Sequence, residues 1–503
     1  MAAAPAPPSP WFSKSPQLGT DEEFARLRRL FEEANYTVEG ICTRFGTTEL
    51  TGFADPPPGG RPMNDALDAL IAFFFDCGFV EETRLAVTLP RGALELFDSL
   101  GLISRDSAPE GTIYTSAAIL PVFGVLTACD RSAAPDRKPC RYPGDIVYPP
   151  VYDTTHRFRA ELPTAKCDAM LDLGTGTGIA ALLCAPTAGH IWASDITPRS
   201  QRFAEFNRRL AGLNNVTVVQ GDMYAPVEGL TFDRIVTHPP YVSARIRKQG
   251  MVFAEAGDDG EQIIRRAIEG VPRFLRPGGR FHSLQAATDR EAEPFEQRVR
   301  KWLGPGNQEF DVMLAVHSRR SPLEFLGNPQ IRSQFTLEGI REWVKLWEET
   351  QTQYMVYAAL LIERHDKPRP TLTQRVQKGE GYTGRELEWL LDWLKQTVRP
   401  DHVEMLLNCR PIARPENEVC EMRRLTDDGF QTERFSLEIP GPFGSQLNCE
   451  QWLTEVVPLC DGTRTWREQF EHAVSAQLIR PDVPIDAFAR LLGMLVAIGA
   501  LKV

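Results

Sequence analysis

A glycine-rich turn with an acidic residue in front of it is the first feature of the sequence that could do chemistry. The segment Met170-Leu-Asp-Leu-Gly-Thr-Gly-Thr-Gly-Ile179 has glycines at 174, 176 and 178 after Asp172. Glycines at this spacing let a ligand lie against the backbone where a strand turns into a helix. A dinucleotide-binding turn would need a glycine at 179 and has no use for Asp172. The turn therefore favours a ligand with an amino-acid head group and a sulfonium, which points to S-adenosylmethionine.

Two more acidic residues end the next predicted strands. Asp195 follows Asp172 by 23 residues, near the spacing of roughly 20 at which an acidic side chain reaches ribose hydroxyls. Asp222 can accept a hydrogen bond from an adenine amino group while Met223 packs on the ring, or it can be a simple turn residue. The predicted cofactor contacts are Asp172, Gly174, Thr175, Gly176, Gly178, Asp195, Ile196, Asp222 and Met223.

A second candidate site follows the fourth predicted strand, which ends in Thr237-His-Pro-Pro-Tyr241. Two prolines make a rigid, extended turn. This turn can present the Pro239 carbonyl and the His238 side chain to a substrate amino group, while Tyr241 packs on a planar group. Methyl transfer needs mainly alignment of the acceptor, which hydrogen bonds to its N–H groups provide. The predicted catalytic residues are His238, Pro239, Pro240 and Tyr241; the alternative is a stiff loop with a solvated histidine.

The elements that must position these residues alternate between short β-branched runs and helical segments. This pattern predicts an α/β, Rossmann-like domain over 141–365, with a parallel sheet and crossover helices. Its seven predicted strands span 169–173, 190–195, 216–220, 233–237, 280–284, 310–316 and 354–362. The acidic positions fall at carboxyl ends of successive strands, where open α/β sheets bind ligands.

The regions outside this domain predict a further part on each side. Residues 1–19 are expected to form a flexible leader, and 20–140 an N-terminal helical domain, either winged-helix-like or a simple cap on the next domain. Residues 366–383 are expected to be a linker. Residues 384–503 are expected to form a mostly helical C-terminal domain.

Composition excludes several classes of protein. The chain has 503 residues, 42% of them hydrophobic, and a net charge of −11, which argues against binding nucleic acid through bulk electrostatics. The first residues lack the charged start and apolar core of a secretory signal, so we expect no export. No window approaches the roughly 18 uninterrupted apolar residues that a spanning helix needs, so we expect no membrane insertion. The ten cysteines include no C-x-x-C pair, so we expect no metal site, no disulfide framework and a cytoplasmic location.

At these motifs the sequence resembles class I S-adenosylmethionine-dependent methyltransferases, and within them the HemK-type release-factor glutamine methyltransferases. The similarity spans about 148–318 and rests on LDLGTGTGIAAL, Asp195, GDMY, FDRIVTHPPY and the later Ala256-Gly-Asp-Asp-Gly260. The resemblance implies that Asp172 and the glycines surround the methionine part of the cofactor. It also implies that Asp195 contacts the ribose, that Asp222 lies near adenine and that the Pro-Pro-Tyr turn contacts the substrate.

One position departs from the family pattern. The glutamine- and base-modifying relatives have Asn, Asp or Ser where this chain has His238. A neutral imidazole can still accept one hydrogen bond, which is compatible with N-methylation. A histidine could equally be a general base for an oxygen nucleophile. The long N-terminal region and the C-terminal extension depart from the family as well.

The acceptor therefore stays open at this point. The leading hypothesis is N-methylation of a protein side chain, glutamine-like, with an RNA base as a variant. For RNA, Arg245, Arg247 and Lys248 could contact phosphate, or they could form a solvated loop. The alternatives are O- or N-methylation of a small natural product, with the outer domains as a lid or homodimer interface, and a cofactor-binding pseudoenzyme that acts as a scaffold. The segment 144–153 is expected either to line the cofactor pocket or to be a connector.

Overall fold

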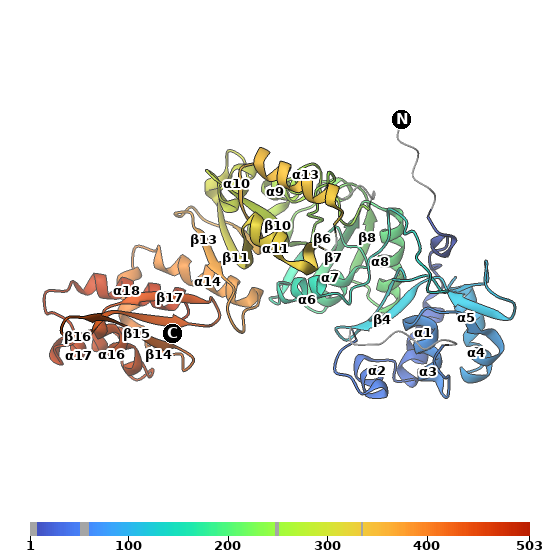
Figure 1. Cartoon of the computed structure of the whole chain (residues 1–503), viewed down its shortest axis with the longest axis horizontal. Coiled ribbons are helices and arrows are strands. Elements are labelled where there is room, and N and C mark those ends of the chain that lie inside the picture. Colours follow the sequence, from blue (N-terminus) through green and yellow to red (C-terminus); the bar gives the residue numbers. More distant parts are fainter. Residues whose placement is uncertain (1–7, 51–59, 247–250, 333–334) are drawn as a thin grey trace. The chain divides into compact units, whose positions relative to one another are not determined.

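A computed structural model describes residues 8–50, 60–246, 251–332 and 335–503 (Figure 1). The chain forms two compact units. The first contains residues 1–287 and 322–353, and the second contains residues 288–321 and 354–503. Both candidate turns lie in the first unit.

The first unit is built on parallel strands in the order β10-β9-β6-β7-β8. Their bounds are β6 (Cys167–Leu173), β7 (Ala188–Asp195), β8 (Val216–Gln220), β9 (Phe232–Thr237) and β10 (Leu275–Arg290). The order reverses at β6, because β7 lies on one side of it and β9 on the other. Ligand sites of open α/β sheets form at such a reversal, outside the carboxyl ends of the strands. The predicted α/β, Rossmann-like class is therefore confirmed for this region.

Helices connect the strands of this sheet. The helix after β7, α8 (Pro198–Leu210), begins as predicted, with the Thr197 side chain accepting from the Ser200 amide and Pro198 in the first turn. The other helices around the sheet in this unit are α6 (Asp153–Ala160), α7 (Ile179–Cys184), α9 (Gln262–Phe274), α11 (Pro322–Gly327), α12 (Pro329–Arg332) and α13 (Leu337–Glu349). A short 3-10 turn, η4 (Ala225–Val227), follows β8.

The N-terminal part of the first unit combines helices with small antiparallel sheets. Its helical elements are η1 (Pro10–Phe12), α1 (Asp21–Glu33), α2 (Val38–Phe45), α3 (Ala66–Leu70), the π-helical turn η3 (Ile71–Phe75), α4 (Glu82–Thr88) and α5 (Ala93–Ser99). Strands β1 (Val80–Glu81), β2 (Ile103–Ser104) and β3 (Thr112–Thr115) pair in the order β1-β3-β2, and β4 (Ala118–Val122) forms a hairpin with β5 (Val125–Cys129).

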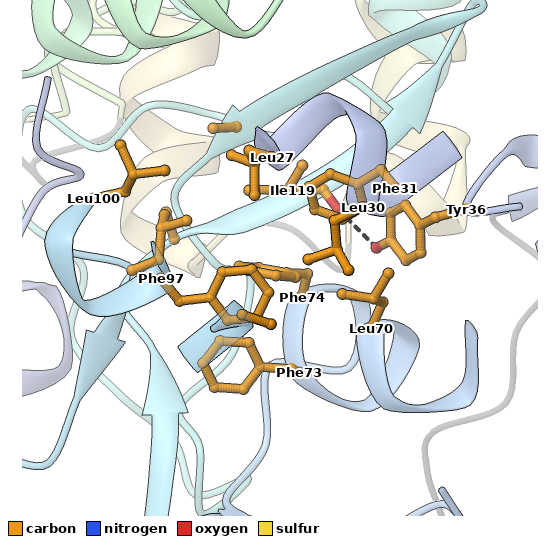
Figure 2. Packing of buried hydrophobic residues seen from close by; sticks show 14 of the residues in the cluster. Leu27, Leu30, Phe31, Tyr36, Leu70, Phe73, Phe74, Phe97, Leu100 and Ile119 are labelled. Carbon is orange, nitrogen blue, oxygen red and sulfur yellow. Dashed lines mark hydrogen bonds between the residues drawn. The ribbon is translucent and has the colours of Figure 1, made fainter. Parts of the chain in front are cut away.

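These N-terminal elements enclose an aromatic core (Figure 2). Phe31, Phe73, Phe74 and Phe97 lie close together in it, and the Tyr36 hydroxyl donates to the Ile119 carbonyl at 2.7 Å. The same core includes side chains of α8, namely Phe203, Phe206 and Leu210. The N-terminal part thus covers α8, which is what the cap interpretation requires.

The second unit contains β11 (Phe310–Arg320), β12 (Thr352–Arg364) and β13 (Thr373–Gln377), in the order β13-β11-β12. Strand β11 is antiparallel to β12 and parallel to β13. The seven predicted strands are thus present as β6 to β12, and β13 is a further strand that pairs with β11. This strand lies inside 366–383, which was expected to be a linker. Its polar sequence, Thr-Gln-Arg-Val-Gln, is largely exposed, so no buried face marks it as a strand.

The C-terminal region of this unit is less helical than predicted. Its helices are α14 (Gly384–Thr397), α15 (His402–Asn408), α16 (Gln451–Val456), α17 (Trp466–Ser475) and α18 (Ile485–Ala497), with the 3-10 turn η6 (Val457–Leu459). Helix α10 (Phe295–Trp302) and the 3-10 turn η5 (Asn307–Glu309) belong to the same unit but precede β11. An antiparallel sheet, β15-β16-β17, lies between α15 and α16, with bounds Glu418–Thr426, Gly429–Ile439 and Ser445–Cys449. Short β14 (Ile412–Ala413) pairs with β18 (Leu501–Lys502). Strand β15 is exposed on both faces, so its sequence lacks the alternating hydrophobic pattern that predicts strands.

Across the described ranges, none of the helices is long and apolar enough to cross a membrane.

Candidate functional site

The glycine turn between β6 and α7 leaves its backbone open on one side. Gly174, Gly176 and Gly178 have backbone φ angles of 75°, 56° and 83°, which residues with a Cβ atom rarely adopt. A Cβ added at Gly174 or Gly176 would have no atom within 4 Å, whereas one at Gly178 would meet the Ala204 Cβ at 3.4 Å. The first two glycines therefore leave space for a ligand, and the third allows α8 to pack closely.

The end of β7 holds this turn in place. Strands β6 and β7 finish side by side, with Leu173 opposite Ser194. The amides of Gly174 and Thr175 donate to the Ser194 carbonyl at 2.8 and 2.9 Å. The Gly176 amide donates to Oδ2 of Asp195 at 2.9 Å, and the Thr197 amide donates to Oδ1 at 3.0 Å. Because each carboxylate oxygen has two lone pairs, Asp195 can brace the turn and still accept from another donor.

Asp172 is a buried carboxyl group, with 2% of its surface exposed. It accepts hydrogen bonds from the Thr175 hydroxyl and, at 3.2 Å, from the Ala181 amide. Burial raises the pKa of Asp172 to about 6, the two hydrogen bonds oppose that rise, and the charge of Asp195 adds to it. A cationic group bound beside Asp172 would stabilise its charged form.

The predicted adenine-side residues lie at the ends of β7 and β8. The Gly221 amide donates to the Asp195 carbonyl at 2.9 Å, which joins the ends of β7 and β8. Asp222 is exposed and accepts from Nη2 of Arg266, on α9, at 2.8 Å. Met223 is half-buried with a φ of 50°, and Ile196 is exposed. No local pattern in the sequence indicates the pair with Arg266, since the two residues lie 44 positions apart.

The Pro-Pro-Tyr turn follows β9, the strand next to β6, and it begins at the same position along the sheet as the glycine turn. Thr237 is opposite Leu173, and its hydroxyl donates to the Leu173 carbonyl at 2.8 Å. The His238 ring stacks on Phe158 of α6, with ring centroids 5.1 Å apart. Burial lowers the pKa of His238 to about 4, so the imidazole is neutral at pH 7. Its Nε2 atom is buried and has no hydrogen-bond partner among the described residues.

A loop before α9 supports the chain after Tyr241. The Val242 amide donates to the Ala254 carbonyl at 2.9 Å, and the Ala256 amide donates back to the Val242 carbonyl at 2.8 Å. Gly260 has a φ of 80°, and a Cβ there would lie 2.9 Å from the Tyr241 carbonyl oxygen. The Ala256-Gly-Asp-Asp-Gly260 motif therefore supports the backbone of the Pro-Pro-Tyr turn.

The segment 144–153 lies against the same loop. The Val252 amide donates to the Gly144 carbonyl at 2.8 Å, and the Tyr148 ring stacks on Tyr152 and Phe253, with centroids 4.6 and 5.0 Å apart. The segment therefore lies beside the loop that supports the Pro-Pro-Tyr turn. The expectation that this segment lines the cofactor pocket stays a prediction.

The basic residues after the Pro-Pro-Tyr turn are only partly described. Arg245 forms an ion pair with Glu349 on α13, with Nη1 and Oε2 2.6 Å apart. Arg247 and Lys248 lie outside the described residues. Arg245 is therefore engaged by a carboxylate of the same unit, which offsets its charge.

The chain matches a family model described as "Methyltransferase domain" over residues 165–315. It is 38% identical to a release factor glutamine methyltransferase of Moorella thermoacetica over 120 residues, which are 22% of this chain and 42% of that protein. It is 32% identical to a ribosomal protein uL3 glutamine methyltransferase of Bradyrhizobium diazoefficiens over 163 residues, 30% of this chain and 50% of the relative. The chain thus spans about half the length, or less, of these two relatives.

A candidate protein N5-glutamine methyltransferase of Methanocaldococcus jannaschii is matched over most of its length. It is 30% identical over 152 residues, which are 29% of this chain and 76% of that protein. The range of the family model, 165–315, contains both the glycine turn and the Pro-Pro-Tyr turn. The chain therefore belongs to the HemK-type family of class I S-adenosylmethionine-dependent methyltransferases.

Proposed function

We propose that this protein transfers a methyl group from S-adenosylmethionine to the side-chain amide nitrogen of a glutamine in another protein. The observation that carries this proposal is that the two turns follow neighbouring strands and begin side by side, since Leu173 at the end of β6 is opposite Thr237 at the end of β9. A cofactor on the first turn and an acceptor on the second would then be neighbours. The names of the relatives, which are glutamine methyltransferases of a release factor and of a ribosomal protein, support the same acceptor class.

The glycine turn fits the cofactor. Open space beside Gly174 and Gly176 would admit a ligand against the backbone, and Asp195 keeps lone pairs for ribose hydroxyls. The residues that would hold the cofactor are Asp172, Gly174, Thr175, Gly176, Gly178, Asp195, Ile196, Asp222 and Met223. When bound, S-adenosylmethionine supplies an electrophilic methyl group on its sulfonium sulfur. Because Asp222 is paired with Arg266, an adenine contact would share that carboxylate.

The second turn would orient the acceptor amide. Pro239 and Pro240 fix the backbone after β9, so the Pro239 carbonyl and the His238 ring keep their positions while a substrate N–H is held. In the reaction the nitrogen–carbon bond forms, the sulfur–carbon bond breaks to leave a neutral thioether, and the proton that the nitrogen loses passes to water. Tyr241 follows the two prolines and would pack on the planar amide.

The low pKa of His238 favours orientation over proton abstraction. A general base works best when its pKa is near the operating pH, and the pKa of His238 is lowered to about 4. Deprotonating a hydroxyl acceptor with such a weak base would be unfavourable. A hydrogen bond to a neutral imidazole, in contrast, remains available over the whole physiological pH range. This supports a nitrogen acceptor rather than an oxygen acceptor.

The charge of the protein supports a protein acceptor over RNA. The net charge is −11, and Arg245, the described member of the expected basic group, is paired with Glu349. Neutralising phosphates requires free basic side chains. We expect a cytoplasmic protein substrate; a homodimer stays a prediction.

The test is transfer of labelled methyl groups into a cell extract by the full-length protein. The inactive variant is Asp195→Asn, and the matched control is Asp168→Asn, an exposed residue at the opposite end of β6. We expect protease-sensitive label from the wild type and the control, with the added methyl group on a glutamine in the peptide mass spectrum. We expect little label from Asp195→Asn.

Other outcomes would replace the proposal. Label that is lost to nuclease would indicate an RNA acceptor, and label in small molecules would indicate the natural-product reaction. No label above the Asp195→Asn variant, together with cofactor binding, would indicate a scaffold.

A further inference from the structure

Helix α8 is shared by the N-terminal part of the first unit and by the glycine turn. One side of it contributes Phe203, Phe206 and Leu210 to the N-terminal core, where the rings of Phe206 and Phe24 are 4.9 Å apart. Another side places Ala204 against Gly178. A displacement of the N-terminal core would therefore move a helix that touches the turn.

Asn207 connects these two sides through hydrogen bonds. Its side chain is fully buried. Its Nδ2 group donates to the Thr177 carbonyl in the glycine turn and to the Ala128 carbonyl in β5, both at 2.8 Å. Its Oδ1 atom accepts from the Ala128 amide at 2.7 Å. Both amide protons and the carbonyl oxygen of the side chain are thus hydrogen-bonded. One bond is to the glycine turn and two are to β5.

This arrangement is specific to an asparagine. A shorter side chain would leave the Thr177 carbonyl and both backbone groups of Ala128 buried without these bonds, which is costly. Asparagine is also a poor residue for a helix interior, so helix formation does not explain its presence. A turn with three glycines has little conformational preference of its own. The conformation of the glycine turn therefore depends on the residues bonded to it, which are those at the ends of β6 and β7 on one side and Asn207 on the other.

We propose that Asn207 is a positioning residue that makes the N-terminal part of the chain a component of the cofactor site. By holding the Thr177 carbonyl against β5, it keeps the glycine turn in its open conformation before the cofactor arrives. The inference rests on the proposed cofactor site. Because coupling between two sites is reciprocal, cofactor binding should also stabilise the bonds of Asn207 to β5.

The first experiment measures cofactor affinity by calorimetry in full-length variants. Asn207→Asp keeps an acceptor for the Ala128 amide but loses the donors to the Thr177 and Ala128 carbonyls, and Asn207→Ala loses every bond. We expect both to bind S-adenosylmethionine about tenfold or more weakly, since a buried hydrogen bond is lost. If turnover is measured, KM for the cofactor should rise while kcat at saturation changes little.

The matched control is Arg28→Ala. The Arg28 side chain joins α1 to the end of α8 by donating to the carbonyls of Arg209 and Leu210, at 2.7 and 3.1 Å, without touching the turn. We expect this variant to lower thermal stability but to keep the affinity within about twofold, because it leaves the Asn207 bonds intact. An equal loss of affinity in Arg28→Ala, or unchanged affinity in folded Asn207 variants, would overturn the proposal.

A second experiment needs no variant. Hydrogen exchange followed by mass spectrometry reports the Ala128 amide within the peptide that covers β4 and β5. We expect saturating cofactor to slow its exchange about threefold or more, because the two sites are coupled. Protection of the 174–178 turn without protection of β5 would overturn the inference but leave the proposed function standing. If the wild type bound no cofactor, the proposed function would fail first.

Discussion

Two titratable residues of the site are each pushed toward their uncharged form. Burial raises the pKa of Asp172 to about 6 and lowers that of His238 to about 4, because loss of water penalises the charged state of an acid and of a base alike. At pH 7 the imidazole is neutral, whereas Asp172 is ionised at a cost. A positively charged ligand would offset that cost at Asp172.

The first prediction concerns the stability of Asp172→Asn. The folded-state pKa lies above the ordinary value of 3.8, so Asp172 favours the folded state most at pH below about 4, and this contribution is lost as the pH rises through 6. We expect the wild type to lose on the order of 2 kcal/mol relative to Asp172→Asn between pH 4 and 7.5. Denaturant unfolding of both proteins at the two pH values measures this difference; parallel pH dependences would contradict it.

The second prediction concerns His238 as an orienting acceptor. His238→Asn keeps a hydrogen-bond acceptor and should retain turnover within about tenfold, whereas His238→Leu should lose it, both with unchanged cofactor affinity. The imidazole becomes charged only near pH 4. Initial rates at saturating cofactor should therefore show no change due to His238 between pH 5.5 and 8, a range that includes the ordinary histidine pKa of about 6.5. A fall in rate through pH 6.5 that disappears in His238→Asn would contradict an orienting role.

At the scale of elements, the site depends on two turns that follow neighbouring strands. The turn after β6 needs positive φ at its glycines, and its open side needs the absence of Cβ atoms. These are separate requirements, one for folding and one for binding. A second glycine that also has a positive φ and open space, but no proposed ligand, can separate them.

The third prediction uses this comparison. Gly176→Ala and Gly229→Ala both place a Cβ at positive φ in open space, at 56° and 83°. We expect each to lower the free energy of unfolding by about 1 kcal/mol, since alanine disfavours this conformation. Only Gly176→Ala should weaken cofactor binding, as measured by calorimetry. If the two variants bound the cofactor with equal affinity, Gly176 would not be part of the cofactor site.

At the scale of the whole molecule, the two compact units have separate cores. The N-terminal core lies within residues 24–210, and the core around Trp466 and Phe488 lies within residues 393–501. In the second core, Trp466 is fully buried, stacks on Phe488 with centroids 4.3 Å apart and donates to its carbonyl at 2.6 Å. Each unit therefore has the packing that a cooperative transition of its own requires.

The fourth prediction follows from these cores. Trp466→Ala should destabilise the second unit by about 4 kcal/mol, and Phe206→Ala should destabilise the first by a similar amount, because large buried aromatic rings leave cavities. In differential scanning calorimetry, we expect one unfolding transition for each unit. S-adenosylmethionine should raise the midpoint temperature only of the transition whose midpoint Phe206→Ala lowers, since a ligand stabilises the unit that binds it. A single transition lowered by both variants would contradict separate units.

The sequence by itself determined the features that depend on neighbouring residues. The glycine turn, the Thr197 cap of α8 and the strands β6 to β12 follow from spacing, caps and hydrophobic runs, and the methyltransferase family is confirmed by the relatives. Strand β13 and the sheet β15-β16-β17 were not predicted. An exposed or edge strand buries too little to leave a hydrophobic pattern, and its pairing partners supply the hydrogen bonds that the local sequence does not reveal.

Only the tertiary structure decided which distant residues meet at the site. Phe158 covers His238, Arg266 pairs with Asp222, and Asn207 joins Thr177 to a strand 79 positions away. The altered pKa values of Asp172 and His238 likewise arise from burial in the folded chain. Contacts between residues far apart in the chain, and the exclusion of water that they produce, depend on how the elements pack, and local spacing does not carry that information.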